Sequence, residues 1–138
     1  MTPHRLQLTI PNGLAEISGV VDALHNFSLQ SNLPNDIDFA LQLVAEEVLS
    51  NIILYGFPNG GSHTILMDVH TNGSEVSMLV QDEGVPFNPL DQPAPVRPVS
   101  LEEMKIGGLG IHLVRNSMDE VTYRREDGRN TLYLTKRL

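Results

Sequence analysis

The chain has 138 residues, of which 41% are hydrophobic and 19% charged, a composition typical of one globular domain rather than a disordered segment. Its net charge of −8 disfavours a nucleic-acid partner, and the absence of Cys excludes disulfides, thiol nucleophiles and Cys-ligated zinc. Because the sequence has neither a signal-peptide pattern nor an apolar run of membrane-spanning length, we expect a cytoplasmic protein with no membrane contact.

The first thirty residues predict a strand followed by a helix. Residues 4–10 alternate between polar and apolar side chains, which is the pattern of a half-buried strand, and the following Pro-Asn-Gly turns the chain. Apolar residues then recur at helical spacing from residue 14 to residue 29. We expect an amphipathic helix there.

A longer helix is predicted next, starting with a cap at Asn35 or Asp36 and ending at Gly56. On it, Glu47 and Asn51 lie four residues apart, on a flank between apolar neighbours rather than on the fully polar stripe. A carboxylate and an amide in this arrangement could act as a general base beside a magnesium ligand. A wide polar face of an ordinary surface helix explains the same two residues.

Two β-rich segments follow, residues 64–70 and 76–81, with Asn-Gly between them as a hairpin signal. From residue 86 to residue 106 the periodicity disappears, and five of the nine prolines fall in this segment. A stretch of this length without a pattern is typical of a lid or a disordered segment. We expect a lid.

A last helix and a second hairpin complete the predicted order β-α-α-β-β-lid-α-β-β. The helix should open at the glycines of residues 107–110 and run to about Met118. Residues 120–125 and 130–137 then alternate around a Glu-Asp-Gly turn, which predicts the two strands of the hairpin.

Two short motifs flank the predicted lid. Asp82 ends a predicted strand, where its carboxylate could accept a hydrogen bond from the amine of an adenine, and Gly84 would let a ring approach the backbone. An acidic turn is the alternative reading of the same residues. The second motif is a glycine-rich run that follows the lid. It would expose backbone N–H groups at the start of a helix, where phosphates bind. It is not a Walker A loop, because it lacks Gly-Lys-Ser/Thr. It consists of Gly107, Gly108, Leu109 and Gly110.

Together, the stretch from Glu47 to Gly56, the Asp82-x-Gly84 motif and the run from Gly107 to Ile111 resemble the N, G1 and G2 boxes of the GHKL (Bergerat-fold) ATPases. The short length and the Pro-rich lid are most similar to the small anti-sigma-factor serine/threonine kinases. The resemblance implies one ATP-binding kinase domain over residues 1–138. Its fold would be an α+β two-layer sandwich, with a mixed, mostly antiparallel sheet covered on one face by about three helices.

The resemblance also implies a role for each matching residue. Glu47 would be the catalytic base and Asn51 the Mg²⁺ ligand, while Asp82 and Gly84 would hold the adenine. Thr131 resembles the Thr that, in this family, lies close to a water molecule bound to the adenine. The family usually has Gly immediately before that Thr, whereas this chain has Asn130. The phosphates would be contacted by Gly107, Gly108, Leu109 and Gly110.

By the same resemblance, the protein would phosphorylate a STAS-domain antagonist with ATP and Mg²⁺, bind a sigma factor or an equivalent regulator, and form a homodimer. Two other functions remain open from the sequence. The chain could be a module that binds a partner in a nucleotide-dependent way, without significant kinase activity. It could also be the detached ATP-binding domain of a histidine kinase, but the first sixty residues contain no helix pair with an obvious acceptor His.

Overall fold

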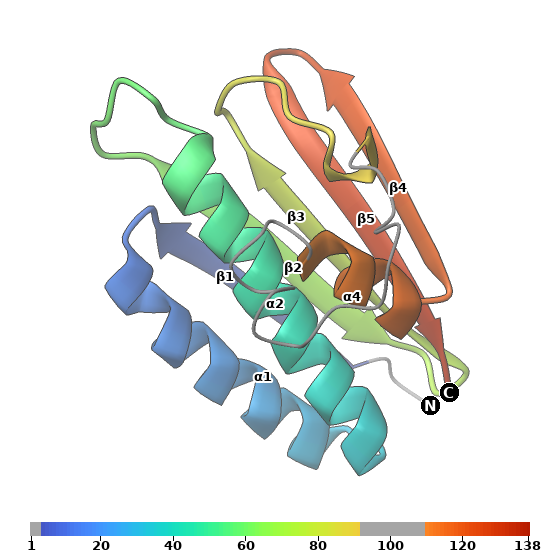
Figure 1. The fold of residues 1–138 in the computed structure, drawn as a ribbon. Helices are drawn as coiled ribbons and strands as arrows, with labels where there is room; N and C mark the ends of the chain where they lie inside the picture. Colours follow the sequence, from blue (N-terminus) through green and yellow to red (C-terminus); the bar gives the residue numbers. More distant parts are fainter. Residues whose placement is uncertain (1–3, 92–109) are drawn as a thin grey trace.

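The strands form one sheet, and the helices pack on one of its faces (Figure 1). The computed structural model describes residues 4–91 and 110–138. The strand order is β1-β2-β3-β5-β4, and each of the four strand pairs is antiparallel. The strands are β1 (His4–Pro11), β2 (Thr64–Thr71), β3 (Glu75–Asp82), β4 (Glu120–Glu126) and β5 (Arg129–Arg137).

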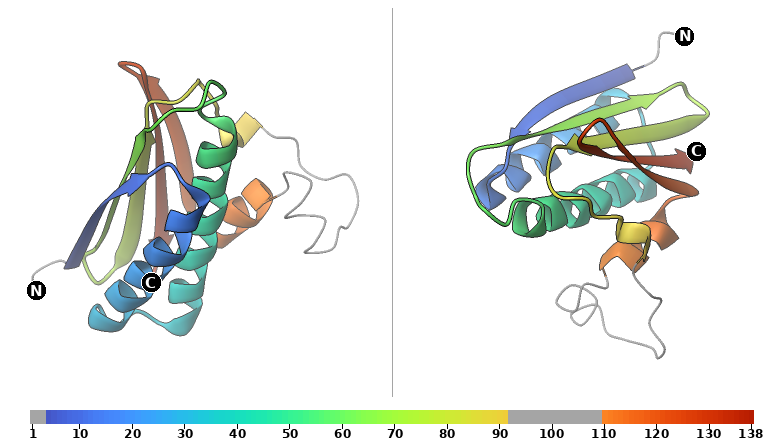
Figure 2. Two further views of the ribbon diagram at one scale, coloured as in Figure 1. Left: turned by 90° about the vertical axis from the view of Figure 1, so that its left-hand side faces the viewer. Right: turned by 90° about the horizontal axis from the view of Figure 1, so that it is seen from above.

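Three helices of the described chain cover the sheet, as the views of Figure 2 show. They are α1 (Ile17–Gln30), α2 (Asn35–Tyr55) and α4 (Gly110–Ser117), and 3-10 turns occur at Leu14–Glu16 and Pro89–Asp91. The predicted α+β two-layer sandwich is therefore confirmed, with a described sheet that is antiparallel throughout. None of these helices is long and apolar enough to cross a membrane.

The core lies between the sheet and the helices because every second strand residue points toward the helical layer. The three inner strands, β2, β3 and β5, contribute alternating buried side chains, and α2, the longest helix, supplies a buried stripe at helical spacing. Burying each such side chain stabilises the fold by roughly 1.5–3 kcal/mol. The fully buried members include Val69, Met78, Leu134, Leu24, Leu41, Val44 and Leu49.

The start of α2 differs from the prediction. Pro34 is its N-cap residue, and no side-chain hydrogen bond caps the helix, so neither Asn35 nor Asp36 plays the predicted part. Instead, the Pro34 carbonyl accepts hydrogen bonds from the backbone N–H groups of Ile37 and Asp38, at 3.1 and 3.0 Å. Asp36 and Asp38 then lie in the first turn, where their negative charge interacts favourably with the positive end of the helix dipole.

Both predicted hairpin turns are confirmed. At the β2–β3 turn, Asn72 Oδ1 accepts hydrogen bonds from the N–H groups of Ser74 (2.9 Å) and Glu75 (3.1 Å), and Gly73 has a φ of 91°. At the β4–β5 turn, Asp127 and Gly128 have φ angles of 54° and 75°. Positive φ at two successive positions is the geometry that Asp-Gly favours in a two-residue hairpin.

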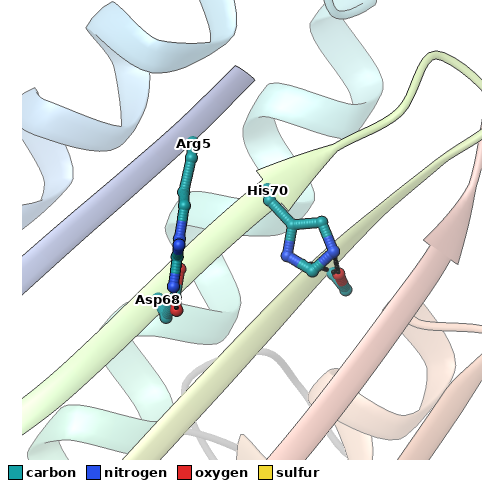
Figure 3. A network of polar contacts seen from close by, with 4 residues as sticks. Arg5, Asp68 and His70 are labelled. Atoms are coloured by element: carbon teal, nitrogen blue, oxygen red, sulfur yellow. Dashed lines mark hydrogen bonds and ion pairs between the residues drawn. The ribbon is translucent and has the colours of Figure 1, made fainter. Parts of the chain in front are cut away.

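The face of the sheet opposite the helices carries a polar network (Figure 3). Arg5 Nε of β1 donates to Asp68 Oδ1 of β2 at 2.9 Å, and this hydrogen bond lowers the pKa of the Asp68 carboxyl. On the same face, the Ser77 hydroxyl lies 3.1 Å from Nε2 of His70. Polar pairs therefore occupy this side of β1, β2 and β3, while the core and the cavity described next lie on the helical side.

Candidate functional site

A narrow cavity of about 40 Å³, partly open to solvent, lies between α2 and the ends of β3, β4 and β5. Apolar side chains make most of its lining, with amide and carboxylate groups among them. The apolar ones include Val48, Ile52, Val80, Val85, Phe87 and Leu132, and the polar amide and carboxylate groups are those of Asn51, Asp82 and Asn130.

Asp82 is the last residue of β3 and is only 5% exposed. Its Oδ1 atom accepts two hydrogen bonds, from Gly84 N at 2.8 Å and from Asn130 Nδ2 at 3.1 Å. No described residue donates to Oδ2. Oδ2 is therefore suited to accept a hydrogen bond from a ligand in the cavity.

Gly84 joins the end of β3 to the end of α2 by direct backbone contact. A Cβ at Gly84 would lie 2.5 Å from the Gly56 carbonyl oxygen and 2.8 Å from Asp82 Oδ1. The Gly56 carbonyl also accepts a hydrogen bond from Val85 N at 2.8 Å. The glycine is therefore needed for the approach of the protein's own backbone, whereas the sequence had suggested room for a ligand ring.

We predict that Gly84→Ala lowers the free energy of unfolding by about 1–3 kcal/mol, since the backbone around Gly56 must shift to admit the methyl group. Urea denaturation measures this change. Gly19→Ala is the matched control: Gly19 is exposed within α1 and has no atom within 4 Å of an added Cβ. It should gain roughly 0.5–1 kcal/mol from helix propensity. An equal change in the free energy of unfolding of the two variants would contradict the explanation by close contact at Gly84.

Glu47 and Asn51 are both half-buried on the flank of α2 that the sequence indicated, whereas the neighbouring Glu46 is exposed. Asn51 lines the cavity, and Glu47 precedes it by one helical turn. Within residues 4–91 and 110–138 no cluster of three or more His, Cys, Asp or Glu side chains could hold a metal by itself. The Asn51 oxygen fits a Mg²⁺ ion that takes its other ligands from nucleotide phosphates and water.

The phosphate motif is only partly within the described chain. Gly107, Gly108 and Leu109 lie outside the described residues, and Gly110 is the first residue of α4. Val114 of α4 and Met118, the residue after this helix, are buried in the core.

The first part of the predicted lid, Pro86 to Asp91, borders the cavity. Phe87 and Pro89 line it, and Arg115 Nη2 of α4 donates to the Leu90 carbonyl at 2.9 Å. Arg125 Nη1 of β4 holds the preceding turn through the Gly84 carbonyl at 2.7 Å. Residues 92–106 of the predicted lid lie outside the described residues.

The structure does not bring Thr131 together with the other predicted site residues. Its hydroxyl accepts a hydrogen bond from Gln81 Nε2 at 3.0 Å, and it lines a separate hollow on the open face of the sheet with Tyr133. Asn130 lines the cavity instead and pairs in register with Asp82. Sequence reasoning missed this role.

A signal for Asn130 was present in the sequence, because alternate residues of a strand share a face. Leu132 and Leu134 are the apolar residues of β5, so residue 130 belongs to the same core-facing set and residue 131 to the other. By the same alternation, Tyr123 of β4 lies on the core-facing side and reaches Asn130 with its hydroxyl.

Comparison with known proteins agrees with this geometry. The family description of the histidine kinase-like ATPase domain matches residues 10–136. The serine/threonine-protein kinase BtrW of Bordetella bronchiseptica is 32% identical over 112 residues, which cover 81% of this chain and 79% of the kinase. The anti-sigma F factor of Oceanobacillus iheyensis is 27% identical over 118 residues, with 84% and 80% of the two chains covered.

Among solved structures, the crystal structure of the RsbU and RsbW domains of Rv1364c from Mycobacterium tuberculosis has a similar fold, with a TM-score of 0.67 at 16% identity. That match covers 100% of this chain and 33% of the larger protein. The fold, the order of the motifs and the similar proteins all point to the same family. The chain belongs to the histidine kinase-like ATPase domain family, and within it to the GHKL anti-sigma-factor serine/threonine kinases.

Proposed function

We propose that this protein is an ATP- and Mg²⁺-dependent kinase that phosphorylates a Ser or Thr of a STAS-domain antagonist. In the same circuit it would capture a sigma factor or an equivalent regulator. The observation that carries the proposal is that Asp82 and Asn51 line one cavity, with Glu47 one turn from Asn51 on the same helix.

The lining of the cavity suits an adenine base, which would lie between the apolar side chains of Val80, Phe87 and Leu132. Asp82 Oδ2 would accept a hydrogen bond from the adenine amine. Asn51 would hold Mg²⁺ through its side-chain oxygen, and Gly110 and the amides around it would contact phosphate. When bound, Mg²⁺ would neutralise charge on the phosphates.

Glu47 would act as the general base. Its carboxylate would take the proton of the substrate hydroxyl as that oxygen forms a bond to the γ-phosphorus, while the bond from phosphorus to the ADP oxygen breaks. A reaction of this kind needs mainly positioning and charge neutralisation, so a small site with one base and one metal is sufficient.

The relatives support the partners that we propose, because one is named a serine/threonine-protein kinase and another an anti-sigma factor. The proposal includes a cytoplasmic homodimer. β1 (His4–Pro11) is an edge strand of the sheet, and an unpaired edge offers backbone groups to a second copy.

The test is to mix the protein with candidate STAS-domain proteins and Mg²⁺-ATP and to read their intact masses. We expect one STAS protein to gain the mass of a single phosphate, on a Ser or Thr that peptide mapping identifies. Nucleotide binding together with partner capture, but with no mass gain in any candidate, would contradict the kinase and support a nucleotide-dependent binding module.

A further inference from the structure

Asn130 has no part in the chemistry described above, although it lies in the same cavity and is only 7% exposed. Its amide makes four hydrogen bonds. Nδ2 donates to Asp82 Oδ1 at 3.1 Å and to the Val85 carbonyl at 2.8 Å. Oδ1 accepts from the Tyr123 hydroxyl and, at 3.4 Å, from Phe87 N. These bonds use both donors and both acceptor sites of the amide.

The surroundings fix which way this amide points. Asp82 Oδ1 and the Val85 carbonyl can only accept, so the NH₂ group must face them. In the reversed orientation the amide oxygen would oppose two other oxygens, and its NH₂ group would oppose the N–H of Phe87. Asn130 therefore has one orientation that satisfies all its neighbours.

We propose that Asn130 is a positioning residue that holds the Asp82 carboxylate and so sets the preference of the cavity for a 6-amino purine over a 6-oxo purine. This inference rests on the proposed nucleotide function. Its premise is that Asp82 Oδ1 already has two donors, Gly84 N and Asn130 Nδ2, and both are held by the fold. Two fixed donors on one oxygen hold the plane of the carboxylate and direct Oδ2 to the ligand.

The selectivity follows from what Oδ2 can accept. The 6-amino group of adenine donates a hydrogen bond, whereas the 6-oxo group of hypoxanthine is an acceptor and would face a carboxylate oxygen. A carboxylate that can rotate loses part of this discrimination, because it can turn Oδ2 away from the oxo group. Without Asn130, only Gly84 N remains on Oδ1.

The experiment measures dissociation constants of ADP and inosine diphosphate for the full chain by calorimetry. The two nucleotides differ at the purine 6-position, so the ratio of their dissociation constants reports the selectivity. We expect Asn130→Ala to reduce the preference for ADP by about tenfold, as for loss of one hydrogen bond to a charged group. Most of the change should be in the ADP affinity.

Tyr123→Phe is the second variant, because it keeps the ring and removes only the hydroxyl that donates to Asn130 Oδ1. We expect Tyr123→Phe to reduce the preference for ADP as well, but by less than Asn130→Ala does. Thr122→Ala is the control, since Thr122 is exposed on β4 and lines the hollow on the open face of the sheet. Its preference for ADP should equal that of the wild type.

The outcomes separate the inference from the function on which it rests. Equal loss of both affinities in the variants, with the selectivity unchanged, would overturn the role of Asn130 and leave the adenine site intact. A wild-type protein that binds the two nucleotides equally would overturn the adenine site and this inference together. If Asn130→Ala does not fold, Tyr123→Phe decides: a lowered preference supports the inference and an unchanged one overturns it.

Discussion

Replacing Glu47 with Gln is expected to slow phosphoryl transfer by about 10²- to 10⁴-fold, which is the usual contribution of a general base. The amide cannot take the proton of the attacking hydroxyl, although it has nearly the same shape as the carboxylate. Nucleotide affinity should change little, because Asn51 and Asp82, which line the cavity, are left unaltered.

Single-turnover transfer to the STAS substrate, together with the dissociation constant of ADP, measures both parts of this prediction. Glu46→Gln is the matched control: it makes the same chemical change at the neighbouring position, whose side chain is exposed. We expect transfer by that variant to equal the wild type. Undiminished transfer in Glu47→Gln would remove Glu47 from the role of base.

Replacing Asp82 with Asn should abolish the stabilisation that adenine nucleotides give. Gly84 N and Asn130 Nδ2 both donate to the Oδ1 position, so the oxygen of the introduced amide must take that position. Its NH₂ group would then face the ligand and oppose the amino group of adenine. The same geometry predicts better acceptance of a 6-oxo purine than in the wild type.

Thermal unfolding with ADP or inosine diphosphate measures this effect. Ligand at about 100 times its dissociation constant should add roughly 2.7 kcal/mol to the wild type, a rise of several degrees. Glu83→Gln is the control, since Glu83 is the next residue and its exposed carboxylate pairs with Arg129 at 3.4 Å. An ADP shift that survives in Asp82→Asn would place the adenine elsewhere.

The sequence predicted the order and type of the elements because the described core depends on simple periodicity. Alternation along β2, β3 and β5 and helical spacing along α2 match the buried residues closely. The turns at Gly73 and Gly128 were also predictable, because positive φ leaves few residue choices. Strand and helix limits differed from the expectation by at most three residues.

Two features of the site were not predictable, because each depends on contacts between distant segments. The close approach of Gly84 to Gly56 joins residues 28 positions apart, and the sequence shows only that both are glycines. Asn130 and Asp82 are likewise brought together by the β3–β5 register. The assignment of Thr131 followed motif order along the chain, and motif order does not state which face of a strand a residue occupies.

The contact between Gly56 and Gly84 has a consequence for how the protein would distinguish ATP from ADP. It links the helix that carries Asn51 to the strand end that carries Asp82 through main-chain atoms, so the spacing of these two residues is set independently of any ligand. In the proposed function, the base and ribose that Asp82 and Asn51 would hold are common to both nucleotides. In that function the third phosphate would be recognised beyond Asn51, on the side of Glu47, so a change from ATP to ADP would leave the base end of the site unaltered.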